Sequence, residues 1–156
     1  MAAAELREQY PQRKILTVDT LAASGGEGLL LWLTLEEQRR GATLEQAAAF
    51  AEGMKLKICH WFTVDDLEYL KRGGRVSPTV ALVGGLLGIR PVMHMDDEGH
   101  LIKMFTVRGR RASLQALVDK YGELAHEPGK TPIFISHGDC MEEAQLLARL
   151  LKEAHG

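Results

Sequence analysis

The sequence predicts an α/β fold, because short apolar segments with the pattern of strands alternate with longer segments that have the pattern of helices. Residues 14–19 and 57–63 have the strand pattern, and a helical segment follows each of them. Residues 89–95 and 101–107 have the pattern of a hairpin around the turn at 96–99. We expect a remnant of a three-layer α/β/α parallel-sheet domain, followed by a two-layer α/β domain with a mixed sheet.

The composition is that of an ordinary globular protein, with 46% hydrophobic and 26% charged residues. Nineteen basic and 21 acidic residues give a net charge of −2, which offers no general attraction to nucleic acid or to an anionic membrane. The two cysteines, Cys59 and Cys140, are too few for a disulfide framework and lack the spacing of a metal site. No signal peptide and no apolar run of about 20 residues occurs. We therefore expect a cytoplasmic protein with no integral membrane segment.

The first 55 residues predict the end of a helix, then a strand and two further helices. Residues 2–10 are the first helix, which Pro11 ends. The strand follows at 14–19, an apolar helix occupies 28–40, and Thr43 caps the next helix. A single strand leaves both of its edges unpaired. This part therefore predicts either additional chain beside it or a homodimer that supplies the neighbours.

Ser24 and Gly25 follow the first predicted strand and are expected in a strand-to-helix loop. Such loops lie at the carboxyl edge of a sheet, where open α/β proteins bind ligands. The alternative is a serine that only caps the next helix, with a glycine in the loop. Both interpretations remain open at this point.

The segment 62–75, FTVDDLEYLKRGGR, has the pattern of a helix with well-marked ends. Thr63 is expected to cap its N-terminus, and Gly73 is expected to adopt the left-handed conformation that ends it. Two basic residues before Gly73 complement the C-terminal end of the helix dipole. Arg75 then follows two glycines, which predicts a loop that faces an anion or a partner.

Residues 80–87 are nearly all apolar and include two adjacent glycines. The glycines suit a place where another backbone or an elongated apolar ligand comes close, and both alternatives remain open. Beyond the hairpin, residues 112–125 predict a helix and residues 132–136 predict a buried strand. Asp139 is expected to cap the last helix, at 141–154.

The sequence contains no phosphate loop, dinucleotide fingerprint, zinc-protease motif or nucleophile elbow. His137 ends the predicted strand at 132–136, but no serine or cysteine nucleophile is identifiable beside it. We therefore assign no catalytic residue, no metal site and no cofactor.

Four segments carry a family resemblance. FTVDDLEYLKRGGRVS at 62–77 closely resembles the signature of the DegV family, bacterial proteins that bind long-chain fatty acids. Further similar motifs occur at 18–31 (VDTLAASGGEGLLL), 94–114 (HMDDEGHLIKMFTVRGRRASL) and 134–139 (FISHGD). The family's early TDST-like segment and late GPxIGxHxGPG segment have no counterpart here. The resemblance therefore implies the middle and later part of such a protein.

What the resemblance implies is a lipid-binding protein, not an enzyme. Residues 1–57 would be the C-terminal remnant of the first, parallel-sheet domain, and residues 58–156 most of the second. A long-chain fatty acid would lie between the two domains, with its carboxylate presented to a separate ATP-dependent fatty-acid kinase subunit. Ser24 and Gly25 would lie near the cleft between the domains. The expected tail-facing residues are Phe62, Leu82, Leu86, Leu87 and Met93, and the expected partner-facing residues are Lys71, Arg72 and Arg75.

Two other classes of function remain as alternatives. The first is a structural or oligomerisation module without a ligand, whose apolar faces are closed by dimerisation. The second is a small anion-dependent enzyme, in which the glycines before Arg75 and the arginines at 108–111 hold a phosphate and His137 acts as base. The absence of an identifiable nucleophile counts against this enzyme.

Overall fold

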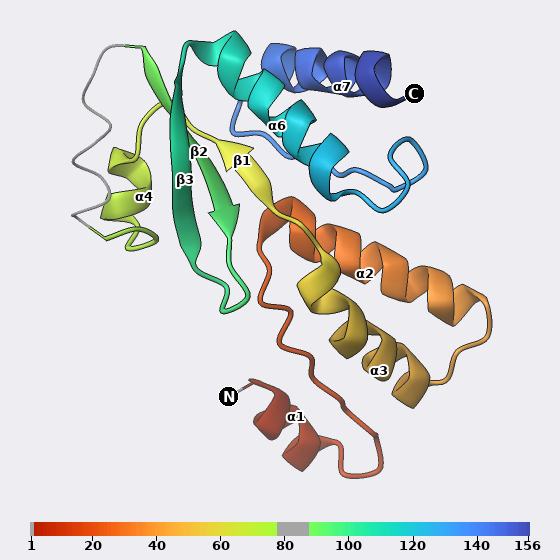
Figure 1. The fold of residues 1–156 in the computed structure, drawn as a ribbon. Helices are drawn as coiled ribbons and strands as arrows, with labels where there is room; N and C mark the ends of the chain where they lie inside the picture. Colours follow the sequence, from red (N-terminus) through yellow and green to blue (C-terminus); the bar gives the residue numbers. More distant parts are fainter. Residues whose placement is uncertain (1, 78–87) are drawn as a thin grey trace. The chain divides into compact units, whose positions relative to one another are not determined.

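The computed structural model describes residues 2–77 and 88–156. The chain divides into two compact units, Met1–Ile58 and Cys59–Gly156, and each is described by itself. Helices combine with a β-sheet, which confirms the predicted α/β class (Figure 1). The apolar segment predicted at 80–87 lies outside the described residues.

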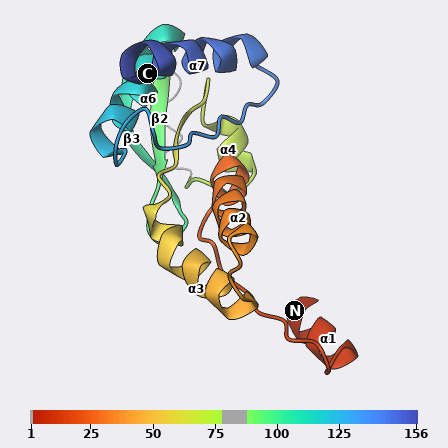
Figure 2. The ribbon, with the colours of Figure 1, turned by 90° about the vertical axis from the view of Figure 1, so that its right-hand side faces the viewer.

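The first unit contains helices α1 (Ala2–Gln9), α2 (Ser24–Arg39) and α3 (Leu44–Met54), followed by the short 3₁₀ helix η1 (Lys55–Lys57). Helices α2 and α3 lie side by side (Figures 1 and 2). The prediction that Thr43 caps α3 is confirmed. Its Oγ1 accepts a hydrogen bond from the backbone of Gln46 at 3.3 Å, and the Gln46 side chain accepts one in return at 2.8 Å.

The strand predicted at 14–19 is wrong, because these residues are not part of a sheet. Instead, side chains hold the segment locally: Arg7 donates a hydrogen bond to the carbonyl of Ile15 at 3.0 Å, and Lys14 pairs with Glu45. A strand needs a neighbouring backbone to pair with its N–H and C=O groups. None of the described residues supplies one here.

The second unit is built on a three-stranded sheet of β1 (Trp61–Thr63), β2 (Ile89–Met95) and β3 (Leu101–Arg108), in the order β1-β2-β3. The predicted hairpin is confirmed as β2 and β3, and Gly99 in its turn has a φ of +82°. Both strand pairs are antiparallel, so the described part of the sheet is not mixed as expected. The segment 132–136, predicted as a further strand, lies outside the sheet and is exposed.

Different elements cover the two faces of this sheet. Helix α6 (Arg110–Leu124) packs on one face and contacts all three strands, and α7 (Met141–His155) packs against α6. On the other face, Met93 of β2 is buried with Leu67 and Val76, which flank the short helix α4 (Glu68–Arg72). Successive side chains of a strand point to opposite faces of the sheet. Phe62 and Met93 are cross-strand partners and share the face covered by α4, whereas their neighbours along β1 and β2 point to the face covered by α6.

The ends of α4 differ from the prediction. Thr63 belongs to β1, and the Asp66 carboxylate accepts a hydrogen bond from the Glu68 backbone at 2.8 Å where the helix begins. Gly73 has a φ of −74°, whereas Gly74 has the left-handed value of +68°. Gly74 donates to the carbonyl of Lys71 at 2.9 Å and Arg75 to that of Leu70 at 2.8 Å, the bonds of a Schellman motif.

The cap of α7 is also corrected. Asp139 does not cap the helix; it has a φ of +56°, and Cys140 occupies the cap position without a side-chain hydrogen bond. The backbone N–H of Cys140 donates to Nδ1 of His137 at 3.2 Å, so an imidazole is the local acceptor. The helices in the described part of the chain are too short or too polar to cross a bilayer.

Candidate functional site

A cavity of about 140 Å³ lies in the second unit, beside β1, between α6, the first half of α7 and the segment that precedes α7. Leu114 and Leu117 are three residues apart on α6 and therefore lie on the same face of that helix. Leu147 of α7 and Ile135 of the preceding segment complete the apolar side together with β1. The apolar lining is thus Trp61, Phe62, Leu114, Leu117, Ile135 and Leu147.

The polar rim of this cavity contains Arg110 and Glu143. Arg110 lies 3.3 Å from the Asp65 carboxylate and 4.0 Å from that of Glu143. Arg90 of β2 reaches the same Asp65 oxygen at 3.3 Å and donates to its carbonyl at 2.9 Å. Two carboxylates and two guanidinium groups therefore balance in charge and connect β2, α6, α7 and the loop before α4.

The ion pairs of Arg110 count against the alternative function of a small anion-dependent enzyme. Arg110, one of the arginines expected to hold a phosphate, is already paired with two carboxylates. His137 lines the same cavity, and its Nδ1 accepts the backbone hydrogen bond that precedes α7. Within residues 2–77 and 88–156, no group of three His, Cys, Asp or Glu side chains could hold a metal ion.

The structure describes two of the five predicted tail-facing residues, and they differ in exposure to the cavity. Phe62 lines the cavity. Met93 has no exposed surface and lies in the apolar cluster with Leu67 and Val76, against which Phe62 also packs. The remaining three, Leu82, Leu86 and Leu87, lie outside the described residues.

Sequence reasoning missed Leu114, Leu117 and Leu147 as lining residues. Their helical spacing was visible in the sequence and indicated an apolar helix face. Nothing in that spacing distinguishes a face that closes on its neighbour from one that borders a cavity, since both need the same residue types.

The predicted partner-facing residues are brought together by α4 and the turn that ends it. Glu68 lies 3.4 Å from the Lys71 ammonium and 3.3 Å from the Arg72 guanidinium. Hydrogen bonds from Arg72 and then Lys71 lower the pKa of Glu68. Arg75 donates to the carbonyl of Gly73, and no carboxylate of the described residues lies within 4.0 Å of it. Arg75 is therefore the cation of this group whose charge is not balanced locally.

Ser24 and Gly25 are not in a loop, as was expected, but are the first two residues of α2. The cap position belongs to Ala23, and Ser24 has a φ of +51°. The helix thus begins four residues before the predicted start at residue 28.

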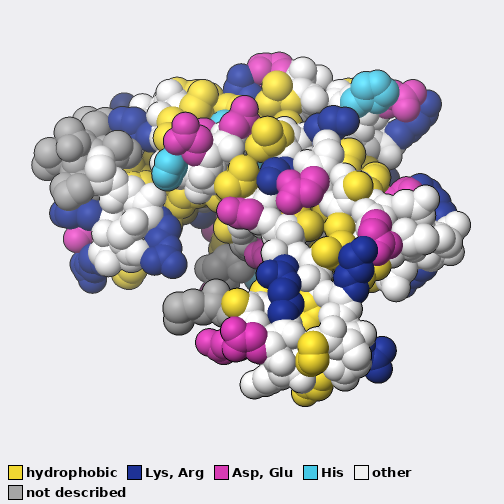
Figure 3. Space-filling model, turned by 90° about the horizontal axis from the view of Figure 1, so that it is seen from below, with side chains coloured by type: hydrophobic (Ala, Val, Ile, Leu, Met, Phe, Trp, Pro, Cys, Tyr) yellow, Lys and Arg dark blue, Asp and Glu magenta, His cyan; other side chains and the backbone are white. Residues whose placement is uncertain are grey.

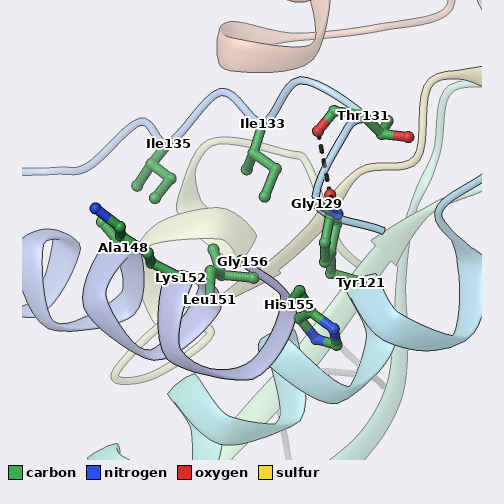
Figure 4. A pocket seen from close by; sticks show the side chains of 10 residues that line it. All are labelled: Tyr121, Gly129, Thr131, Ile133, Ile135, Ala148, Leu151, Lys152, His155 and Gly156. Carbon is green, nitrogen blue, oxygen red and sulfur yellow. Dashed lines mark hydrogen bonds between the residues drawn. The ribbon is translucent and has the colours of Figure 1, made fainter. Parts of the chain in front are cut away.

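A second cavity, of about 310 Å³, lies between the ends of α6 and α7 and the segment at 129–135. Figure 4 shows Ile133 and Ile135 facing it from that segment, with Leu151 and Lys152 on α7 opposite. Tyr121 of α6 contacts the segment at 129–135, because its hydroxyl donates a hydrogen bond to the carbonyl of Thr131 at 3.1 Å (Figure 4). None of the predicted site residues that the structure describes lines this second cavity.

Acidic and basic side chains are interspersed on the face shown in Figure 3, with hydrophobic side chains between them. A continuous basic surface, which nucleic acid binding would favour, is not visible on that face. The net charge of −2 agrees with this view.

Comparisons with known proteins point to one family. A sequence model described as "Uncharacterised protein, DegV family" matches residues 1–156. A DegV domain-containing protein of Clostridium perfringens is 39% identical over 155 residues, which cover 99% of this chain and 53% of the relative. The chain thus spans about half the length of that curated relative.

Solved structures resemble the chain in the same way. A DegV family protein from Eubacterium eligens, described as loaded with heptadecanoic acid, superposes with a TM-score of 0.87 at 25% identity, over 99% of this chain and 55% of its own. The Streptococcus pneumoniae Fatty Acid Kinase (Fak) B3 protein, described as loaded with linoleic acid, has a TM-score of 0.83 over 99% of this chain and 54% of its own. At 23% identity, this second likeness shows the fold alone.

Proposed function

Because this chain belongs to the DegV family, we propose that it carries part of a site that binds a long-chain fatty acid. The observation that carries the proposal is the cavity beside β1, which has six large apolar side chains in its lining, the predicted residue Phe62 among them. An acyl chain gains about 0.8 kcal/mol for each methylene that it buries. The heptadecanoic acid named for the Eubacterium eligens structure supplies the chemical class of the ligand.

In this proposal the acyl tail runs past Phe62 into the cavity between α6 and α7. Leu82, Leu86 and Leu87 would extend the apolar wall. Met93 would lie beside Phe62 on the same face of the sheet, because the two residues are cross-strand partners and pack in the same cluster.

The whole protein would hold the fatty acid between two domains. We assign residues 1–57 to the C-terminal part of the first domain and residues 58–156 to most of the second. Ser24 and Gly25, at the start of α2, would border the cleft, where the positive end of a helix dipole suits an acid. Such a protein binds its ligand and does not catalyse a reaction.

The partner in this proposal is a fatty-acid kinase subunit in the cytoplasm, to which the carboxylate is presented. This assignment comes from the family resemblance, and the Streptococcus pneumoniae neighbour adds a likeness of fold only. Lys71, Arg72 and Arg75 would face the partner, with Arg75 as the cation available for a new ion pair.

Native mass spectrometry of the purified chain, followed by denaturing lipid extraction, tests the ligand. A long-chain fatty acid should co-purify or load on incubation. Replacing Leu147, which lines the cavity, by Trp should reduce loading by filling it, whereas the neighbouring Leu146→Trp should not. Equal fatty-acid loading of the Leu147→Trp and Leu146→Trp variants would show that the acyl chain does not occupy this cavity. An absence of loading even in a longer chain that restores both domains would refute fatty-acid binding.

The second candidate is a structural or oligomerisation module without a ligand. Large apolar side chains on the surface favour it, such as Met104 of β3 at 48% exposure and Ile133 at 41%. Sedimentation velocity decides this point: a stable dimer without lipid would favour the module, and a monomer would exclude it.

A further inference from the structure

The two cavities described for the second unit follow one another along helices α6 and α7. On α6, Leu117 lines the first cavity, and Tyr121, four residues further on, lines the second. On α7, the same spacing separates Leu147 at the first cavity from Leu151 at the second. Residues four apart lie on the same face of a helix. The two cavities are therefore neighbours on the same faces of both helices.

Ile135, in the segment before α7, lines both cavities. Figure 4 shows its side chain beside that of Ile133, facing α7 across the second cavity. Ile135 is 36% exposed, and its segment lies outside the sheet. A shift of this side chain therefore breaks no hydrogen bond between the described strands, and it would join the two cavities.

The first cavity is too small for the whole of a long acyl chain. Its volume is about 140 Å³, and an apolar protein cavity of about 150 Å³ holds benzene, a molecule of about six carbons. The second cavity has a volume of about 310 Å³, and its lining includes the apolar side chains of Ile133, Ala148 and Leu151. The second cavity therefore offers apolar surface for the methylenes that the first cannot hold.

An aromatic pair stands at the end of the second cavity, near the C-terminal ends of α6 and α7. The rings of Tyr121 and His155 meet edge to face, 5.2 Å apart. The Tyr121 hydroxyl donates to the Thr131 carbonyl at 3.1 Å and accepts from the Gly129 backbone at 3.0 Å. Nε2 of His155 lies 3.2 Å from the Val118 carbonyl. These polar atoms already have partners, which suits the methyl end of a fatty acid better than its carboxylate.

We infer that the second cavity is a terminal subsite for the methyl end of a long acyl chain, and that the chain displaces Ile135 to reach it. The chain passes Phe62 and fills the first cavity, and its last carbons lie beside Ile133 and Leu151. The inference rests on the proposed function and adds a selection for chain length. Each methylene buried beyond the first cavity should raise affinity by up to about fourfold.

The test measures the Kd of the delipidated chain for octanoic, dodecanoic and hexadecanoic acid by isothermal titration calorimetry. Wild-type affinity should rise at least about tenfold at each step in length, because the added methylenes enter the second cavity. Ala148→Trp, which fills that cavity, should leave the Kd for octanoic acid within about twofold of wild type and weaken hexadecanoic acid at least about tenfold. Ala154→Trp is the matched control, because Ala154 is an exposed alanine of α7 that lines neither cavity.

The orientation of the ligand is tested at Lys152, which lines the second cavity and has no carboxylate of the described residues within 4.0 Å of its ammonium group. Lys152→Met should leave the Kd for hexadecanoic acid within about twofold of wild type, because the methyl end lies there. A loss of about tenfold would place the carboxylate in the second cavity and overturn the inference.

The chain-length series separates the inference from its premise, and the wild-type part of it does not depend on any variant. Wild-type affinity that stops rising beyond octanoic acid would overturn the inference while fatty-acid binding stands, since the first cavity alone would explain it. Equal Kd values of wild type and Ala148→Trp for hexadecanoic acid would have the same meaning. An absence of binding for all three acids would overturn the inference together with the proposed site.

Discussion

Replacing Gly129 by Ala should destabilise the second unit more than the same change at Gly74, Gly88 or Gly109, which also have positive φ but no atom within 4 Å of an added Cβ. Gly129 has a φ of +84°, and a Cβ added there would lie 2.4 Å from the backbone oxygen of His155. The left-handed conformation alone costs about 1 kcal/mol for alanine. Moving the backbone to relieve the contact would also break the hydrogen bond from Gly129 to the Tyr121 hydroxyl, worth about 1 kcal/mol. We therefore expect a loss of about 2–4 kcal/mol in the free energy of unfolding.

Two other glycines separate these contributions. Gly74 has a φ of +68° but has no atom within 4 Å of an added Cβ, so Gly74→Ala should show only the conformational cost of about 1 kcal/mol. Gly138 has neither feature, and Gly138→Ala should change stability by less than about 0.5 kcal/mol. The difference between Gly129→Ala and Gly74→Ala then measures the contact with α7.

Urea unfolding followed by Trp61 fluorescence is the appropriate assay, because Trp61 belongs to the same unit and stacks on His94 at 4.8 Å. A Trp32→Phe background removes the other tryptophan. A loss in Gly129→Ala no larger than that in Gly74→Ala would refute the close packing of this loop against the end of α7.

Three further changes follow from the same structure. Gly122→Ala places a Cβ 2.6 Å from the His155 ring, so the imidazole must move and its hydrogen bond with the Val118 carbonyl should be lost. The gain from alanine's helix propensity should therefore fall short of the gain of about 1 kcal/mol at an open helical site, and urea unfolding that shows the full gain would contradict this. Arg110→Met removes an ion pair to the largely exposed Asp65 and should cost less than about 1 kcal/mol, and a loss above about 2 kcal/mol would indicate a buried network. The backbone hydrogen bond from His100, followed by that from Glu98, lowers the pKa of Asp96 from its usual 3.8. The ionised Asp96 therefore adds to the stability of the hairpin above pH 3.8, and this stabilisation is lost as the pH falls through the lowered pKa. Urea titrations should therefore show Asp96→Asn less stable than wild type near neutral pH, with the difference shrinking in acid; a difference that is constant with pH would refute this.

Elements that depend on neighbours in the sequence were predicted well. The cap of α3 involves Thr43 and Gln46, three residues apart, and the β2–β3 hairpin closes around Gly99. The left-handed glycine of α4 was displaced by one residue, from Gly73 to Gly74. Both Gly73 and Gly74 can adopt the left-handed conformation, so the sequence alone does not show which of the two does.

Sheet membership was predicted less well. Residues 14–19 and 132–136 have the composition of strands, but neither segment belongs to the described sheet. A strand is completed by hydrogen bonds to a backbone that is distant in the sequence, whereas a helix completes its own. The composition of a segment therefore indicates only that it can form a strand. Whether it does so depends on a second strand from elsewhere in the structure.

The sequence by itself determined the α/β class, the order of most helices, the hairpin and, through four motifs in order, the family. It could not determine which apolar residues are buried together and which line a cavity. Phe62 and Met93 were predicted as equivalent, but only Phe62 lines the cavity, while Met93 lies fully in the core. Tertiary structure decided this, because a cavity is the space left when distant elements pack, and no single segment encodes that space.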